Sequence, residues 1–190
     1  LKQKVSKIAK ISIITASAIM VIALIYYGFK NKSKVIKKKK GILLLGGLDN
    51  RSGDKKIDEQ VQLVKKGIID NIDVKGYRYN DLDGILNAIN LNPDYTIMLF
   101  SAGASKSKEV AQKVKEVGGS LDNIYIIEPY HKGGTATKSV RKAVEIGVPE
   151  KNVITGTYDS VGKGIAENST PTPKCSPSHW CSLTEVAKFV

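Results

Sequence analysis

Short apolar runs alternate with helix-like stripes along residues 41–190, and this alternation most limits what the chain can fold into. The apolar runs have the length and residue content of buried strands. They are Ile42–Leu45, Ile72–Tyr77, Tyr95–Phe100, Asn123–Ile127 and Val153–Thr155. Between the runs, apolar residues recur every three or four positions, as at Ile57, Val61 and Val64, which is the period of a helix packed on one side.

This alternation predicts an α/β fold built from β–α–β units. Strands joined by helices run parallel, and their sheet is covered on both faces. We therefore expect a three-layer sandwich with a mainly parallel sheet of about five strands. A last helix is predicted to begin at Ser182–Glu185, which fits a capping box, and no clear strand is visible between Asp159 and His179.

The positive charge of the chain is concentrated in its first 40 residues. The 190-residue chain carries 30 basic and 18 acidic side chains, a net charge of +12. Residues 1–40 contain 11 lysines and no acid, which leaves 19 basic and 18 acidic side chains in residues 41–190. The predicted folded part is therefore almost neutral, and its charge does not predict a nucleic-acid partner.

An uncharged segment of 19 residues, Ile11–Phe29, is predicted to span a membrane. A helix of that length covers about 28 Å, close to the thickness of the hydrocarbon core. Lysines flank it on both sides, unlike a buried core helix, and Ala16-Ser17-Ala18 lies inside the run, unlike a signal-peptide cleavage site. We expect a membrane anchor at residues 1–30, a basic tether at 31–40, a domain at 41–190, and membrane lipid as a partner.

The side of the membrane stays open at this point. Seven lysines follow the predicted span and four precede it, which favours a cytoplasmic domain by the positive-inside rule. Cys175 and Cys181 instead have the spacing of a small disulfide, which would favour an oxidising compartment. The sequence indicates neither their pairing nor the oligomeric state.

Three residues with complementary chemistry lie in loops that we expect at one edge of the sheet. Ser101 follows the third strand, Asp159 follows the fifth, and His179 precedes the last helix. A serine hydroxyl needs an imidazole as general base, and the imidazole needs a carboxyl group to hold its tautomer. We expect Ser101 as nucleophile, His179 as base and Asp159 as the orienting acid. His131 is the other histidine of the chain and the next candidate base.

The segments around these residues resemble the α/β-hydrolase superfamily in a reduced, cutinase- or esterase-like form. The segments are Leu44–Leu48 (LLGGL), similar to an oxyanion-loop strand, Leu99–Gly103 (LFSAG), similar to a nucleophile elbow, and Thr157–Val161 (TYDSV), similar to an acid turn. The resemblance implies that the N–H groups of Leu48 and Ala102 form the oxyanion hole. The chain departs from the family pattern in having Leu99 where a small residue is usual and Gly46 where a histidine is usual.

The resemblance implies a serine hydrolase that cleaves carboxylic esters through an acyl-enzyme, and the predicted anchor makes it membrane-bound, with a lipid or an acylated molecule as the expected substrate. Asp49, Asn50 and Trp180 would then contact the substrate. No cofactor and no metal are predicted, because the chain has neither a G-x-G-x-x-G or P-loop fingerprint nor an HExxH or paired Cys/His set.

Each of these residues also has an ordinary structural interpretation. Ser101 is a suitable N-cap for the following helix, and Asp159 is a common turn residue. Two further functions therefore stay open: a non-catalytic Rossmann-like module that binds a small anion or a partner at the membrane, and a degenerate hydrolase fold.

Overall fold

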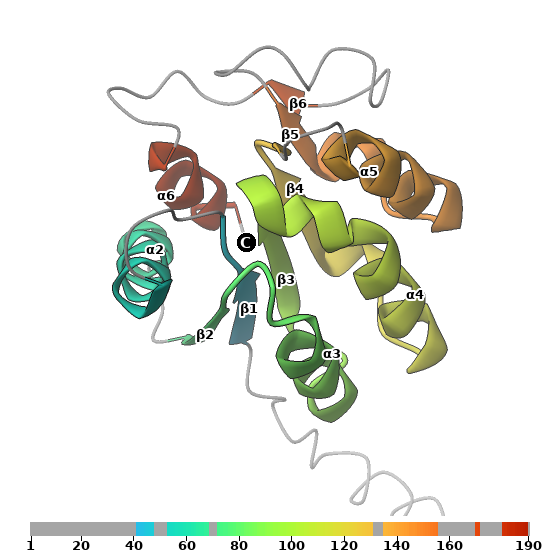
Figure 1. Cartoon of the computed structure of the whole chain (residues 1–190), viewed down its shortest axis with the longest axis horizontal. Helices are drawn as coiled ribbons and strands as arrows, with labels where there is room; N and C mark the ends of the chain where they lie inside the picture. The colour runs from blue at the N-terminus through green and yellow to red at the C-terminus, as the bar shows by residue number, and fades with distance from the viewer. Residues whose placement is uncertain are drawn as a thin grey trace, which may run out of the picture. The chain divides into compact units, whose positions relative to one another are not determined.

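Parallel strands form the centre of the fold in the computed structural model, which describes residues 41–47, 53–68, 72–130, 135–155, 170–171 and 180–189 (Figure 1). These residues belong to one unit, residues 39–190. The strands are β1 (Gly41–Leu45), β2 (Asp73–Tyr77), β3 (Thr96–Phe100), β4 (Ile124–Ile127), β5 (Val153–Thr155) and β6 (Thr170–Pro171). Their order in the sheet is β2-β1-β3-β4-β5-β6, and each neighbouring pair is parallel.

The five strands expected from the sequence are confirmed within one residue at each end, and the described part contains a sixth. The sixth strand, β6, pairs with β5 through Ile154 with Thr170 and Thr155 with Pro171. The expectation that no strand separates Asp159 from His179 is therefore wrong. A two-residue strand that contains a proline leaves no apolar run for a pattern to detect.

Helices cover both faces of the sheet, as expected for an α/β sandwich (Figure 1). They are α2 (Gly53–Gly67), α3 (Leu82–Leu91), α4 (Ser107–Glu116), α5 (Thr135–Ile146) and α6 (Cys181–Ala187), with short 3₁₀ helices η1 (Ser101–Lys106), η2 (Leu121–Asn123) and η4 (Glu150–Asn152). The apolar residues of α3, α4 and α5 pack in one core cluster, and those of α2 and α6 pack in the other.

Successive side chains of a central strand point alternately into the two core clusters. In β1, Leu43 and Leu45 belong to the cluster of α3, α4 and α5, whereas Ile42 and Leu44 belong to the cluster of α2 and α6. All five residues of β1 are buried. Burial on both faces explains why the strand reads as a continuous apolar run instead of an alternating one.

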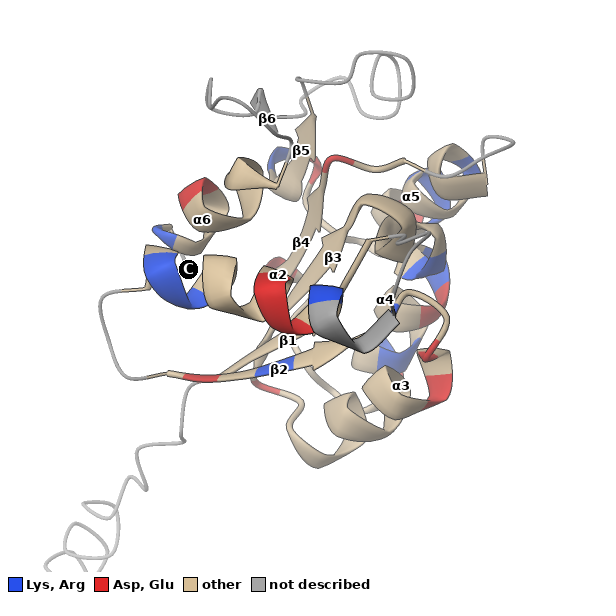
Figure 2. Ribbon diagram, turned by 60° about the vertical axis from the view of Figure 1, so that its left-hand side comes forward, with Lys and Arg blue, Asp and Glu red and all other residues tan. Residues whose placement is uncertain are grey.

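The edge strand β2 differs from the central strands in carrying charge, which Figure 2 shows as coloured segments on that strand. Lys75 lies 3.8 Å from a carboxylate oxygen of Asp73, and both side chains are partly exposed. Charged side chains on an edge strand discourage pairing with a further chain.

The strand order reverses direction between β1 and β3. The connection from β1 to β2 passes through α2 on one face, whereas the connection from β3 to β4 passes through α4 on the opposite face. The chain therefore leaves β1 and β3 toward opposite faces of the sheet. A crevice outside the carboxyl ends of these two strands is where open α/β sheets bind ligands.

The start of α6 differs from the predicted capping box. The N-cap residue is Trp180, which makes no side-chain cap hydrogen bond, and Ser182 is completely buried inside the helix. Thr184 bonds to α2 instead, and Glu185 pairs with Lys188. The polar pattern of Ser182–Glu185 therefore serves tertiary packing and a surface ion pair.

No helix among the described residues has the length and apolar character needed to cross a membrane. The predicted span, Ile11–Phe29, lies outside the described residues, as does the whole of the predicted anchor and tether.

Candidate functional site

Ser101 occupies an unusual backbone conformation at the carboxyl end of β3. Its φ is +52°, a left-handed value that serine seldom adopts. Its side chain is almost buried, with 6% of the residue exposed. η1 has Phe100 as its N-cap and α4 has Lys106, and no described residue hydrogen-bonds the Ser101 hydroxyl. The structure therefore does not support the interpretation of Ser101 as a helix cap.

Two glycines allow the turn after β3 to approach the end of β1 closely. A Cβ on Gly103 would lie 2.3 Å from the carbonyl oxygen of Leu45 and 2.8 Å from that of Gly46. A Cβ on Gly47 would lie 3.0 Å from the Cβ of Ser101. The two turns at the strand-order reversal are thus in contact, and a side chain at position 103 would push them apart.

Gln60 of α2 holds the Gly46-Gly47 segment. Its side-chain oxygen accepts the backbone N–H of Gly47 at 3.1 Å, and the residue is 1% exposed. The N–H of Gly46 in turn donates to the carbonyl of Tyr77, at the end of β2, at 2.8 Å. Both glycine amides therefore have acceptors within the fold.

Gln60 was not singled out from the sequence, although a signal for it exists. It stands three residues after Ile57 and immediately before Val61, on the apolar stripe of the predicted helix. A polar residue on the inner face of a helix must find a hydrogen-bond partner in the core. The partner in this fold is the backbone of the strand end.

The phenol of Tyr77, at the end of β2, has a raised pKa. Partial burial is the largest cause and raises the pKa above its ordinary value of 10.0, because the phenolate loses solvation. The negative charges of Asp81 and, to a smaller extent, Asp73 raise it further. Tyr77 therefore keeps its proton throughout the physiological range.

Glu128 follows β4 and lies beside the turn that carries Ser101. Its φ is +47°, and 6% of the residue is exposed. Its N–H donates to the carbonyl of Ile154 at 2.8 Å, and two residues further on the N–H of Tyr130 donates to the carbonyl of Ser101 at 3.2 Å. The segment after β4 is thus tied to the candidate nucleophile, while the Tyr130 side chain is half exposed.

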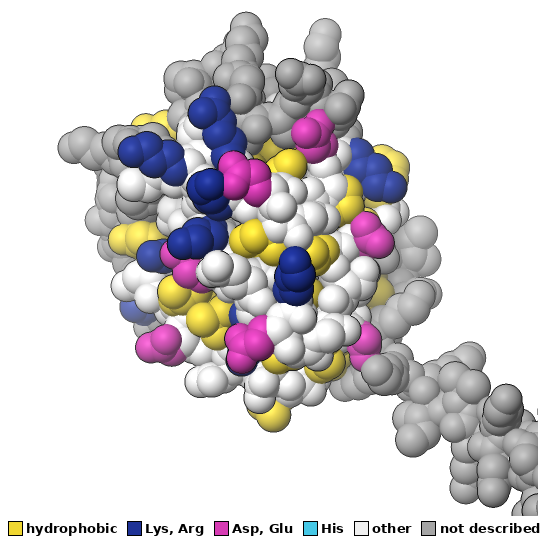
Figure 3. All heavy atoms as spheres, turned by 90° about the vertical axis from the view of Figure 1, so that its right-hand side faces the viewer, with side chains coloured by type: hydrophobic (Ala, Val, Ile, Leu, Met, Phe, Trp, Pro, Cys, Tyr) yellow, Lys and Arg dark blue, Asp and Glu magenta, His cyan; other side chains and the backbone are white. Residues whose placement is uncertain are grey.

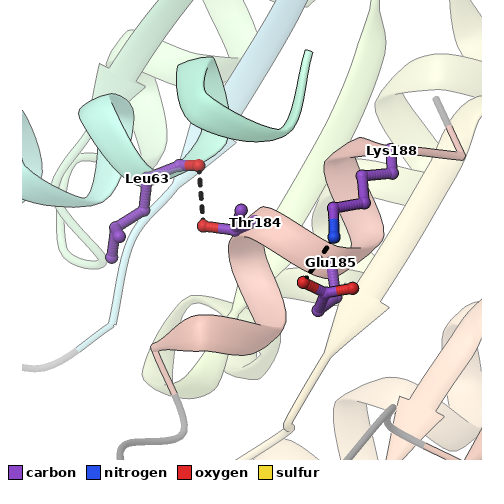
Figure 4. Close-up of polar contacts among 4 residues, drawn as sticks. All are labelled: Leu63, Thr184, Glu185 and Lys188. Atoms are coloured by element: carbon purple, nitrogen blue, oxygen red, sulfur yellow. Dashed lines mark hydrogen bonds and ion pairs between the residues drawn. The ribbon is translucent and has the colours of Figure 1, made fainter. Parts of the chain in front are cut away.

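Helix α6 packs against α2, and the two helices run parallel to each other. Thr184 donates its hydroxyl to the carbonyl of Leu63 at 2.9 Å (Figure 4). The ammonium group of Lys56 lies 5.6 Å from the centre of the Trp180 ring, which is a cation–π distance. Because α2 begins beyond the carboxyl end of β1, Trp180 also lies at that edge of the sheet.

Cys181, the first residue of α6, is disulfide-bonded. The chain has one other cysteine, Cys175, which lies outside the described residues. The helix is therefore fixed covalently at its start as well as by its contacts with α2.

The face that carries α3, α4 and α5 mixes both signs of charge (Figure 3). Lys113 pairs with Glu116 at 3.5 Å, and Lys142 pairs with Glu145 at 2.6 Å. Among the described residues, no group of three or more His, Cys, Asp or Glu side chains is arranged to hold a metal ion.

The structure describes three of the residues that the sequence singled out. Ser101 and Ala102 lie in the first turn of η1, and Trp180 lies at the start of α6. The others lie outside the described residues; they are Leu48, Asp49, Asn50, His131, Asp159 and His179. Their proximity to Ser101 stays a prediction.

In comparison with known proteins, no family model, no curated protein and no solved structure matches the chain.

Proposed function

We propose that the chain is a membrane-anchored serine hydrolase that cleaves carboxylic esters. The observation that carries this proposal is the left-handed backbone of Ser101, φ +52°, at the point where the strand order reverses. A non-glycine residue in this conformation costs about 1–2 kcal/mol, and such strain is concentrated at functional sites. A sharp strand-to-helix turn at serine is also the geometry that presents a nucleophile above a parallel sheet.

The surroundings of Ser101 suit an oxyanion hole. Ala102 N–H belongs to the first turn of η1, whose amides have no acceptor within the helix. The Gly46-Gly47 segment lies against this turn, and Gln60 fixes it from the other side. An oxyanion between the two turns would receive the N–H of Ala102 and, from the loop after Gly47, that of Leu48.

The base is expected from the segment before α6. Trp180 lies at the carboxyl edge of the sheet and is held by Lys56, and His179 is the residue before it in the chain. The disulfide at Cys181 and the contact of Thr184 with Leu63 would restrict the movement of that segment. An imidazole that must accept a proton in a fixed direction needs such support.

The proposed reaction proceeds through an acyl-enzyme. Ser101 Oγ bonds to the acyl carbon while His179 takes the hydroxyl proton, and the carbonyl oxygen becomes the oxyanion. The bond from carbon to the alkoxy oxygen then breaks, and His179 returns the proton to the leaving alcohol. Water attacks the acyl group in the same way, gives its proton to His179, and releases the carboxylic acid and Ser101. The sequence assigns the orientation of His179 to Asp159.

The predicted anchor supports a substrate at a membrane surface. A hydrolase tethered by Ile11–Phe29 and a basic segment would meet lipid or acylated esters at high local concentration. The half-exposed ring of Tyr130, beside Ser101, offers an apolar contact for an acyl chain.

A fluorophosphonate probe tests the nucleophile, because only an activated serine reacts with it. The full chain in detergent should be labelled once and should hydrolyse p-nitrophenyl esters. Ser101→Ala should lose both reactions, whereas Ser105→Ala, on the same 3₁₀ helix, should keep both. His179→Gln should lose both as well. If His131→Gln has the larger effect, His131 is the base. Equal labelling of Ser101→Ala and the wild type would end the proposal.

The second candidate function, a non-catalytic module that binds a small anion or a partner, predicts no labelling of the wild type. The strand order supports this alternative as well, because the point of reversal in an open α/β sheet is where such folds bind small ligands of many kinds. A degenerate hydrolase fold predicts the same absence of labelling together with the hydrolase arrangement of Ser101, Asp159 and His179.

A further inference from the structure

The two non-glycine residues with positive φ among the described residues are neighbours on adjacent strands. Ser101 has φ +52° and Glu128 has φ +47°. Phe100 of β3 pairs with Ile127 of β4, so each left-handed residue is the next position after a paired one. Neighbouring strands lie about 4.8 Å apart, which places the two backbones side by side at the carboxyl edge.

Glu128 has two features that each lower the stability of the fold. Its left-handed backbone is strained, and its residue is 6% exposed although its side chain carries a carboxyl group. Glu128 makes a further interaction in the fold besides its backbone hydrogen bonds, and a buried carboxyl group needs a polar partner. Hydrogen bonds on both sides, to Ile154 and from Tyr130 to Ser101, fix the segment in this conformation.

We infer that Glu128 is the acidic positioning residue of the Ser101 site, the role that the sequence assigns to Asp159. The inference rests on the proposed function. An imidazole that bonds to Ser101 with one ring nitrogen needs a carboxyl group within reach of the other. Glu128 is anchored one strand away from Ser101, and its side chain is one methylene longer than that of an aspartate.

The position of Glu128 was not evident from the sequence because the residue opens a polar loop, Glu128–Gly134. A glutamate between a strand and a loop is ordinarily a solvated surface residue. Only the burial and the backbone conformation distinguish it.

Isosteric substitutions in the full chain test the inference. Glu128→Gln keeps the shape of the side chain and should lower kcat about 10²- to 10⁴-fold, with KM changed by less than about threefold. Glu128→Asp should recover part of the loss. Asp159→Asn should lose at least about tenfold less than Glu128→Gln. Glu116→Gln, an exposed acid on α4, should match the wild type.

The pH profile separates a positioning role from a structural one. A carboxyl group beside the imidazole favours its protonated form, so its removal should lower the pKa of the base. The acid limb of kcat/KM in Glu128→Gln should therefore move about one unit toward lower pH. A merely structural residue would lower the unfolding temperature without moving this limb.

Each result decides between the two proposals. A larger loss in Asp159→Asn than in Glu128→Gln would overturn the role of Glu128 and leave the serine hydrolase intact. A loss in Glu128→Gln that appears only in the melting temperature, with an unmoved acid limb, would overturn it too. If Glu128→Gln does not fold, Glu128→Asp and Asp159→Asn decide the matter by the same comparison. Full activity in Ser101→Ala would end both proposals.

Discussion

The side-chain oxygen of Gln60 accepts the backbone N–H of Gly47 at 3.1 Å, and this bond connects α2 to the loop beside Ser101. The Gln60 side chain is buried, with 1% of the residue exposed, and Gly47 is partly buried. The Gly47 amide would therefore be left without an acceptor if the side chain were replaced by an apolar one. The bond matters for the shape of the loop as well as for stability.

We expect Gln60→Leu to lower the free energy of unfolding by about 1–3 kcal/mol, the cost of a buried donor without a partner. Gln62→Leu, an exposed position on the same helix, should change it by less than about 0.5 kcal/mol. Urea unfolding of the two variants measures both effects. If the two variants proved equally stable, the bond to Gly47 would contribute little, and the loop would be held by other contacts.

The left-handed backbone of Ser101 predicts an unusual order of stability among its variants. Ser101→Ala keeps the Cβ that makes φ +52° unfavourable, whereas Ser101→Gly removes it. Relief of about 1–2 kcal/mol of strain exceeds the entropic cost of glycine, about 0.5–1 kcal/mol. Ser101→Gly should therefore be more stable than Ser101→Ala by about 0.5–1 kcal/mol.

The matched control for this comparison is Ser107, which has an ordinary helical φ of −57°. Both of its variants lose the same hydrogen bond from the hydroxyl to the carbonyl of Ala104. Ser107→Gly should be less stable than Ser107→Ala by about 1 kcal/mol, the usual order in a helix. Thermal unfolding of the four variants measures the difference, and the same order at both positions would show that Ser101 is not strained.

The sequence was sufficient to locate the five main strands and the helices, because buried strands and packed helices each require a characteristic pattern of apolar residues. A strand buried on both faces must be apolar throughout, as Leu43 and Leu44 of β1 are, and a packed helix must repeat its apolar residues as α2 does. The sequence could not provide the strand order. Strands that are apolar on both faces have similar sequences, and these do not indicate which strand pairs with which.

The site was less predictable because its decisive features are conformational. A serine after a strand can either cap a helix or form a strained turn, and the sequence is the same in both cases. The positive φ of Ser101 could therefore not be predicted. The need for glycine at position 103 could not be predicted either, because it arises from the close approach of the Leu45 carbonyl oxygen, where a Cβ would collide. The capping box failed because α6 begins at Cys181, which places Ser182 inside the helix and not at its N-cap.

The contact between Thr184 and Leu63 should stabilise the docking of α6 measurably. Thr184→Val keeps the shape of the side chain and removes the hydroxyl that donates at 2.9 Å, which should cost about 0.5–1.5 kcal/mol. Thr184→Ser retains the donor and should cost less. Glu185→Gln, which breaks the exposed pair with Lys188 on the same helix, should cost less than about 0.5 kcal/mol. Urea unfolding measures all three, and a larger loss in Glu185→Gln would contradict the assignment.

The raised pKa of Tyr77 predicts a loss of stability in alkaline solution. Burial raises the pKa in the folded state above the ordinary value of 10.0, and the charges of Asp81 and Asp73 add to the effect. Between pH 10.0 and the raised pKa, the unfolded chain therefore loses its phenol proton while the folded chain keeps it. Stability falls with rising pH wherever the folded state binds more protons, so this window destabilises the fold.

Tyr77→Phe has no proton to lose and should show a smaller decline in the free energy of unfolding from pH 9 to about pH 11 than the wild type. Asp81→Asn removes one of the negative charges and should lower the pKa of Tyr77, although it keeps an acceptor for the N–H of Gly84 at the start of α3. Absorbance at the phenolate band, recorded against pH, follows the ionisation directly. If Tyr77→Phe declined as steeply as the wild type, another group would cause the alkaline loss, because the phenol would then ionise alike in the folded and unfolded chains.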